Sequence, residues 1–168
     1  MELVKPTLEM KAAYLDFAAD WEASGEEITP YAARLLGGES YEAWVERNDQ
    51  PRRYRQRYVP SSVYFLTDGG EIVGAIDIRH HLNDDLLRDG GHIGYGVRPS
   101  RRRQGNASTM LKMALPVAKG LGFGRALITC DKANVASART IRKNGGALEN
   151  EVPDGERITQ RYWIDLTK

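Results

Sequence analysis

The chain has 168 residues, and its 24 lysines and arginines against 23 acidic residues leave a formal net charge of +1. This length predicts one domain over residues 1–168. A hydrophobic content of 41% excludes a disordered chain. The near-neutral charge disfavours a dedicated binder of nucleic acid or of a membrane surface, because such proteins usually carry a basic excess.

The cysteine and histidine content predicts neither a disulfide framework nor a metal site. Cys130 is the lone cysteine, and no Cys/His spacing resembles a structural zinc site. The N-terminus lacks the apolar segment of a signal peptide, and no apolar run approaches the roughly 18 residues of a membrane span. These features predict a cytoplasmic protein that does not cross a membrane.

The N-terminal part reads as a short strand followed by two helices. The strand ends at Pro6, and the first helix extends from Thr7 to Gly25 with apolar residues at steps of three and four. The second helix covers residues 40–48. The stretch 51–58 contains four arginines and predicts a loop, which is either a solvated basic surface or a wall that attracts an acidic substrate or partner.

From residue 63 onward the apolar pattern changes to that of strands. Strands over 63–67 and 71–79 are separated by the turn signal Asp68-Gly69-Gly70. The remaining predicted elements follow in chain order: a short helical turn over 82–87, a strand over 92–97, a basic loop over 98–105, a helix over 106–119, a buried strand over 126–130, a helix over 134–144, and strands over 147–152 and 158–166. This order predicts an α/β (α+β) fold with a mixed sheet of about six to seven strands and about four helices.

The transition from strand to basic loop to helix at residues 92–119 is typical of a phosphate site. Backbone N–H groups and the positive end of the helix point at the anion, and a glycine allows close approach. The loop is not a P-loop, because no Gly-Lys-Ser/Thr follows, and it lacks the three glycines of a dinucleotide fingerprint.

The loop fits the pattern Arg/Gln-x-x-Gly-x-Gly/Ala through Arg102, Gly105 and Ala107. It resembles the acetyl-CoA signature of the GNAT acetyltransferase superfamily. Residues 94–100 resemble the family's fourth strand, residues 126–130 the fifth, and Asn134 opens the helix that follows. The resemblance covers the chain from Ile72 onward, whereas the N-terminal half matches only in the order of its elements.

This resemblance implies a single-domain GNAT-like fold and transfer of an acetyl group from acetyl-CoA, without a metal, to a primary amine that attacks the thioester directly. The amine belongs to a small molecule or a peptide, and a homodimer is possible. One of Arg98, Arg101 and Arg103 would reach the 3′-phosphate of the nucleotide. The residues implied in cofactor binding are Tyr95, Gly96, Val97, Arg102, Arg103, Gln104, Gly105, Asn106, Ala107 and Asn134.

One position departs from the family. Many members have a tyrosine seven residues beyond the asparagine, which protonates the departing thiolate, but here that position is Ile141. Ser137, one turn earlier, is the nearest hydroxyl by helical spacing, and a packing role suits it equally well. Water or the substrate ammonium are the other proton sources.

A histidine is the residue type best suited to accept the amine proton at neutral pH. His92 opens the strand expected at the cleft and is the first candidate for the general base. At most one of His80 and His81 can face the site if the strand continues, because neighbours in a strand face opposite sides. Asp77 shares a face with Arg79 and can pair with it.

Two other functions remain open on the sequence. A relative that binds an acyl-CoA without catalysis, as a sensor or interaction module, would explain the missing tyrosine. A nucleic-acid binder would use the two arginine clusters, although the neutral overall charge disfavours it.

Overall fold

The structure is a computed structural model that describes residues 1–49 and 59–168. The basic stretch predicted as a loop, residues 51–58, lies outside the described residues. The strands and α-helices are β1 (Glu2–Val4), α1 (Lys11–Ala23), α2 (Tyr41–Asp49), β2 (Ser61–Asp68), β3 (Glu71–Arg79), β4 (Ile93–Val97), α3 (Asn106–Gly120), β5 (Arg125–Asp131), α4 (Val135–Lys143), β6 (Ala147–Asp154) and β7 (Arg157–Asp165). The predicted α+β class is confirmed.

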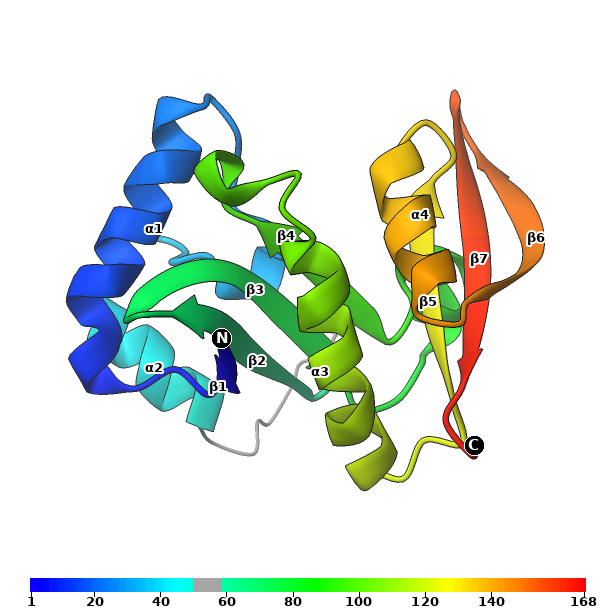
Figure 1. The fold of residues 1–168 in the computed structure, drawn as a ribbon, viewed down its shortest axis with the longest axis horizontal. Helices are drawn as coiled ribbons and strands as arrows, with labels where there is room; N and C mark the ends of the chain where they lie inside the picture. Colours follow the sequence, from blue (N-terminus) through cyan, green and yellow to red (C-terminus); the bar gives the residue numbers. More distant parts are fainter. Residues whose placement is uncertain (50–58) are drawn as a thin grey trace.

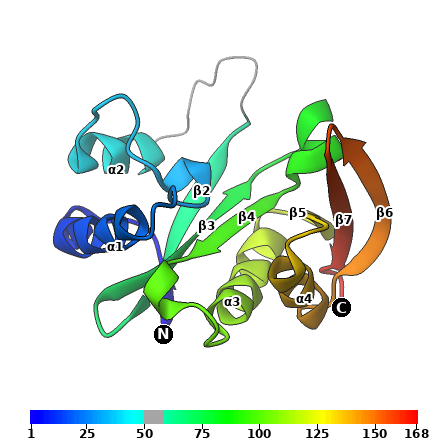
Figure 2. The same cartoon turned by 90° about the horizontal axis from the view of Figure 1, so that it is seen from above.

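The strands form two sheets, with the order β1-β2-β3-β4 in the first and β5-β7-β6 in the second. Helices α1 and α2 cover one face of the first sheet, and α3 covers the other (Figures 1 and 2). Helix α4 packs beside α3 and against β5. The chain therefore has helices on both faces of its first sheet, in the layered arrangement that buries a sheet completely.

Strand β3 is the centre of the packing and is buried over seven consecutive residues. On its α1 side, Trp44 stacks between Tyr14 and Phe65, with ring centroids 5.6 and 5.7 Å away. On its α3 side, Ile76 and Met110 belong to a second apolar cluster that extends across to the second sheet. The two clusters explain why β3 reads as a nearly continuous apolar run in the sequence.

The two sheets meet at His92. The His92 carbonyl accepts a hydrogen bond from the Arg79 amide of β3 (2.8 Å), and the His92 amide donates to the Leu127 carbonyl of β5 (2.7 Å). Beyond this point, no ladder joins β4 to β5 among the described strands. The mixed sheet predicted from the sequence is thus divided into two sheets that diverge from one junction.

The segment between α1 and α2 lies directly on the α1-facing side of β4. A Cβ atom built on Gly96 would come within 2.3 Å of the Thr29 carbonyl oxygen, and one on Gly94 would come within 3.5 Å of Pro30. Glycine is therefore required at position 96 for the Thr29–Pro30 segment to reach the strand.

We expect Gly96→Ala to lower the free energy of unfolding by about 1–3 kcal/mol, because the methyl group displaces backbone that cannot yield cheaply. The matched control is Gly120→Ala at the last residue of α3, where a Cβ meets nothing within 4 Å. That variant should be neutral or slightly stabilised, since alanine favours a helix. Urea unfolding measures both, and equal stabilities of the two variants would contradict the close approach.

Candidate active site

A cavity of about 470 Å³ opens where β4 diverges from β5. It is bounded by β4, the basic loop that follows it, the start of α3 and one face of α4. Its lining residues are Tyr95, Gly96, Val97, Arg101, Arg102, Arg103, Gly105, Asn106, Ala107, Ser108, Asn134, Ala136, Ser137, Arg139, Thr140 and Lys143. The structure thus brings together every residue predicted to bind the cofactor except Gln104, and Ser137, the candidate for the acid, lies among them.

Backbone amides line the phosphate end of the cavity. The helical bonding of α3 begins with the Thr109 amide on the Gly105 carbonyl (3.0 Å), so the amides of residues 106–108 have no acceptor within the helix. Arg103 and Gly105 have positive φ angles of 60° and 78°, which turn the loop sharply into α3. A Cβ on Gly105 would meet no atom within 4 Å, so this residue borders open space. The arrangement is a cradle for an anion at a helix N-terminus.

The edge of β4 that faces away from β3 supplies two further donors, the amides of Tyr95 and Val97. Their direction follows from the Arg98 amide, which bonds to the Val73 carbonyl of β3 (2.9 Å). Because pairing alternates along an antiparallel strand, the amides of Tyr95 and Val97 point to the opposite edge, toward the divergence. A chain of polar ligand groups can therefore bond along β4 as a strand would.

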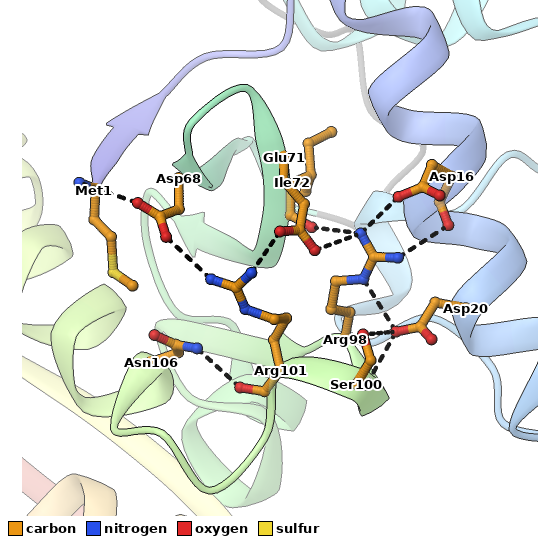
Figure 3. A network of polar contacts seen from close by, with 10 residues as sticks. All are labelled: Met1, Asp16, Asp20, Asp68, Glu71, Ile72, Arg98, Ser100, Arg101 and Asn106. Carbon is orange, nitrogen blue, oxygen red and sulfur yellow. Dashed lines mark hydrogen bonds and ion pairs between the residues drawn. The ribbon is translucent and has the colours of Figure 1, made fainter.

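A network of ion pairs around the buried Arg98 side chain supports the loop (Figure 3). The Arg98 side chain is 7% exposed and pairs with Asp16 (2.8 Å), Asp20 (3.0 Å) and Glu71 (3.1 Å). Asp20 also accepts hydrogen bonds from the Ser100 amide (3.1 Å) and hydroxyl (2.8 Å). Although burial would raise the pKa of Asp20, the hydrogen bonds from Ser100 and Arg98 lower it below its ordinary value.

Arg101 extends the same network. Its guanidinium pairs with Glu71 (2.6 Å) and Asp68 (3.0 Å), and its carbonyl accepts from the Asn106 side chain (2.8 Å). Arg98 and Arg101, which the sequence offered as phosphate ligands, are therefore neutralised by carboxylates and serve to shape the loop. Of the three arginines considered for the 3′-phosphate, Arg103 is the one left exposed at the cavity.

Arg102 is also held by neighbours. It forms a two-pronged ion pair with Glu26 (2.8 and 2.9 Å), donates to the Val97 carbonyl (3.1 Å) and lies over the Trp21 ring at 5.0 Å. The signature arginine thus anchors the end of β4 to the segment after α1.

Two cations that the sequence analysis missed lie on α4. Arg139 and Lys143 line the cavity one turn apart, and in the described part of the chain no acidic side chain lies within ion-pairing distance of either. Their spacing from Ala136 places them on one helix face, which is the signal that could have found them.

Two hydroxyl groups meet in the cavity wall. The Tyr95 hydroxyl from β4 lies 2.9 Å from the Ser137 hydroxyl of α4. Asn134 caps α4 by accepting a hydrogen bond from the Ser137 amide (3.1 Å), which fixes the first turn. Burial raises the pKa of Tyr95 to about 12. Ile141, the residue at the family's tyrosine position, is fully buried.

His92 lies at the junction and is not among the residues that line the cavity. Its Nδ1 accepts a hydrogen bond from the Leu127 amide (2.9 Å), and its ring packs against Phe123 at 4.5 Å. Burial, with a smaller effect of Arg79, lowers its pKa to about 4. This geometry gives no support to His92 as the general base, because the ring already bonds to the backbone and is a weak base.

The other candidates for the base also lie apart from the cavity lining. His80 bonds to the Ser62 hydroxyl (2.8 Å) at the end of β3, and His81 is exposed. Asp77 is buried beside Arg79, at 3.6 Å. Within residues 1–49 and 59–168, no three His, Cys, Asp or Glu side chains gather as a metal site, and no helix is long and apolar enough to span a membrane.

Comparisons with known proteins agree with this geometry. A family model described as an acetyltransferase (GNAT) domain matches residues 1–147. No curated protein gives a significant match. The family match begins at the first residue, so it includes the N-terminal half, which the sequence resemblance reached only through element order. The chain belongs to the GNAT acetyltransferase family.

Solved structures share the fold at low sequence identity. The putative acetyltransferase yncA from Salmonella typhimurium, solved with acetyl-CoA, has a TM-score of 0.65 and 15% identity over 99% of this chain and 94% of its own. RimL, a ribosomal L7/L12 α-N-protein acetyltransferase solved with coenzyme A, has a TM-score of 0.68 and 18% identity over 97% and 92%. An N-acetyltransferase from Staphylococcus aureus Mu50 has a TM-score of 0.65 and 17% identity over 99% and 98%.

The depressed pKa of His92 predicts a pH dependence of stability. Since the folded pKa of about 4 lies below the ordinary value of 6.5, the unfolded state binds the proton more tightly. The stabilisation that the neutral His92 ring gives the folded state is therefore complete above pH 6.5 and is lost as the pH falls toward 4. Between pH 7 and 5, the free energy of unfolding should fall by about 1–2 kcal/mol more in the wild type than in His92→Asn. Urea unfolding at both pH values measures this, with His81→Gln, at an exposed site, as the variant that should keep the wild-type slope.

Proposed function

We propose that this protein is an N-acetyltransferase that moves the acetyl group of acetyl-CoA to the primary amine of a small molecule or a peptide. The observation that carries the proposal is the cavity between β4 and β5, which ends on the unpaired amides of residues 106–108. Family membership supports the reaction type, and two similar structures were solved with acetyl-CoA and coenzyme A.

The residues of the cavity suit the pyrophosphate, the pantetheine arm and the thioester of this cofactor. The pyrophosphate suits the amide cradle, where the helix dipole and the Arg103 side chain add positive potential. The amide groups of the pantetheine arm suit the free edge of β4. The Val97 amide would donate to the thioester carbonyl, whose oxygen gains negative charge when an amine attacks.

The acceptor is proposed from chemistry. A neutral amine attacks the thioester carbonyl, and the amine proton passes to water, since the candidate bases lie apart from the cavity. RimL acts on the N-terminus of a ribosomal protein, which supports an amine at the end of a peptide as one class to test.

The proposed function is tested by screening amines with thiol release as the readout. Small amines, amino acids and peptides with free N-termini form the panel, and mass spectrometry of the product checks the added acetyl group. Release of CoA with an N-acetylated product supports the proposal. Binding of acetyl-CoA without transfer to any amine would favour the alternative, an acyl-CoA-binding relative that acts as a sensor.

Gly105→Val should weaken acetyl-CoA binding by at least a hundredfold. The positive φ of Gly105 strains a β-branched residue, and the new side chain would occupy the space of the pyrophosphate. Calorimetry measures the affinity, with Gly122→Val, at a second positive-φ glycine outside the cavity lining, as the control for strain alone. Undiminished affinity in Gly105→Val would remove the cradle from cofactor binding.

Arg139 and Lys143 are proposed to bind the 3′-phosphate of the nucleotide in place of Arg103, which belongs to the loop of the pyrophosphate cradle. Arg139→Ala should lower the affinity for CoA about tenfold, since a charge-assisted hydrogen bond is lost. The same variant should bind 3′-dephospho-CoA as well as the wild type does, because the group it recognises is absent. The matched control is Arg142→Ala on the same helix, whose guanidinium lies over the Tyr162 ring at 5.4 Å. If Arg139→Ala lost the same affinity for CoA and for 3′-dephospho-CoA, the assignment would be wrong.

A further inference from the structure

A pair of hydroxyl groups lies in the cavity wall. Tyr95 comes from β4 and Ser137 from the first turn of α4, on opposite sides of the divergence. Their oxygens lie 2.9 Å apart, and the Tyr95 hydroxyl lies 3.4 Å from the Ser137 carbonyl. This contact links the two sides of the cavity directly, although 42 residues separate the partners in sequence.

The direction of the bond between the two hydroxyls decides which proton can be donated. When the Tyr95 hydroxyl donates to the Ser137 oxygen, the proton of the Ser137 hydroxyl is not used by that bond. In the opposite direction the Tyr95 proton can bond to the Ser137 carbonyl (3.4 Å), so the first direction is the one that serves proton donation. Cys130 lies behind the pair, where burial raises the pKa of its thiol and a hydrogen bond with Ser137 opposes part of that rise. Thr140 supplies a third hydroxyl beside Tyr95.

We propose that Tyr95 and Ser137 act as one unit that protonates the thiol group released from the cofactor. The inference rests on the proposed function, and it assigns a catalytic role to a tyrosine on β4. The family's usual tyrosine position is occupied by Ile141, so the hydroxyl comes from the opposite side of the cavity.

The proton balance of the step is complete. The amine nitrogen forms a bond to the acetyl carbon, and the carbon–sulfur bond breaks with its electron pair on sulfur. Sulfur takes the proton of the Ser137 hydroxyl, and the Ser137 oxygen takes that of Tyr95. The proton lost by nitrogen passes to water, and water returns one proton to Tyr95. Because the pKa of Tyr95 is raised to about 12, the phenol begins each turnover protonated at neutral pH.

Kinetics of three variants test the unit. Tyr95→Phe and Ser137→Ala should each lower kcat by about a hundredfold, the lower range for general acid catalysis, with KM for acetyl-CoA changed less than about threefold. The double variant should lose little more than either single one, because groups that act as a unit are not additive. Wild-type rates in Tyr95→Phe, or multiplied losses in the double variant, would overturn the proposal.

Two control variants separate this role from packing. Tyr64→Phe removes a hydroxyl from a half-buried tyrosine of β2 that is not part of the cavity lining and should leave kcat unchanged. Thr140→Val tests whether the third hydroxyl carries the proton instead. A large loss in Thr140→Val alone would transfer the role to Thr140 and overturn the proposal.

A measurement without turnover tests the same contact. The thiol of bound CoA is titrated by the ultraviolet absorbance of its thiolate, with the protein-alone titration of Cys130 and the tyrosines subtracted. Hydrogen bonds to an anion lower its pKa, so the pKa of the bound thiol should be about one unit higher in Tyr95→Phe than in the wild type. The cations that line the cavity (Arg101, Arg102, Arg103, Arg139 and Lys143) are common to both proteins. Equal pKa values would show that the pair does not face the sulfur.

The two proposals fail in different ways. If no amine is acetylated, the proposed function fails, while the thiol titration still reports on Tyr95. If the wild type is active and both hydroxyl variants match it in rate and in thiol pKa, only the role of the pair is lost.

Discussion

The site depends on a single junction between two sheets. His92 gives its carbonyl to β3 and its amide to β5, while its ring accepts the Leu127 amide that would otherwise need a partner in a ladder. One residue thus completes the hydrogen bonding at the point where the ladders separate. Beyond it, the edges of β4 and β5 are free to bond something other than each other, and that freedom creates the cavity. A histidine is suited to this place only in its neutral form, because the ring nitrogen must accept a hydrogen bond.

The phosphate loop shows how a basic sequence is made rigid before an anion binds. Carboxylates of α1 and of the β2–β3 hairpin form ion pairs with Arg98 and Arg101, and Glu26 forms one with Arg102. Partly buried pairs of this kind contribute modest net stability, because desolvation offsets attraction. Their effect here is geometric: they hold the backbone so that its amides face the cavity. The anion then meets preorganised donors, and little ordering remains to oppose binding.

The sequence was informative where a local pattern determines the structure. The order of the main strands and helices depends on patterns of a few adjacent residues, and the structure has these elements in the predicted order, with ends that differ by a few residues. The roles of Arg98 and Arg101 depend instead on ion pairs with Asp16, Asp20 and Glu71, which lie far away in sequence. A run of basic residues alone therefore could not distinguish phosphate-binding arginines from structural ones. The same holds for Tyr95 and Ser137, whose contact exists only because β4 and α4 face each other. The prediction of His92 as the base depends on its residue type alone, and its bond to the Leu127 amide, outside the cavity lining, gives that role no support.

The segment from Asp16 to Glu26 contacts the phosphate loop at several points. Asp16 and Asp20 form ion pairs with Arg98. Glu26 forms an ion pair with Arg102, whose guanidinium also lies over the Trp21 ring. This arrangement restricts how chain length can vary. One residue inserted between Asp16 and Trp21 would rotate the later contacts by about 100° around the helix axis and release the loop. Length changes between Gly37 and Ser40 leave these contacts in register. The N-terminal half can therefore vary in length after the Thr29–Pro30 segment, which itself packs against Gly96 of β4.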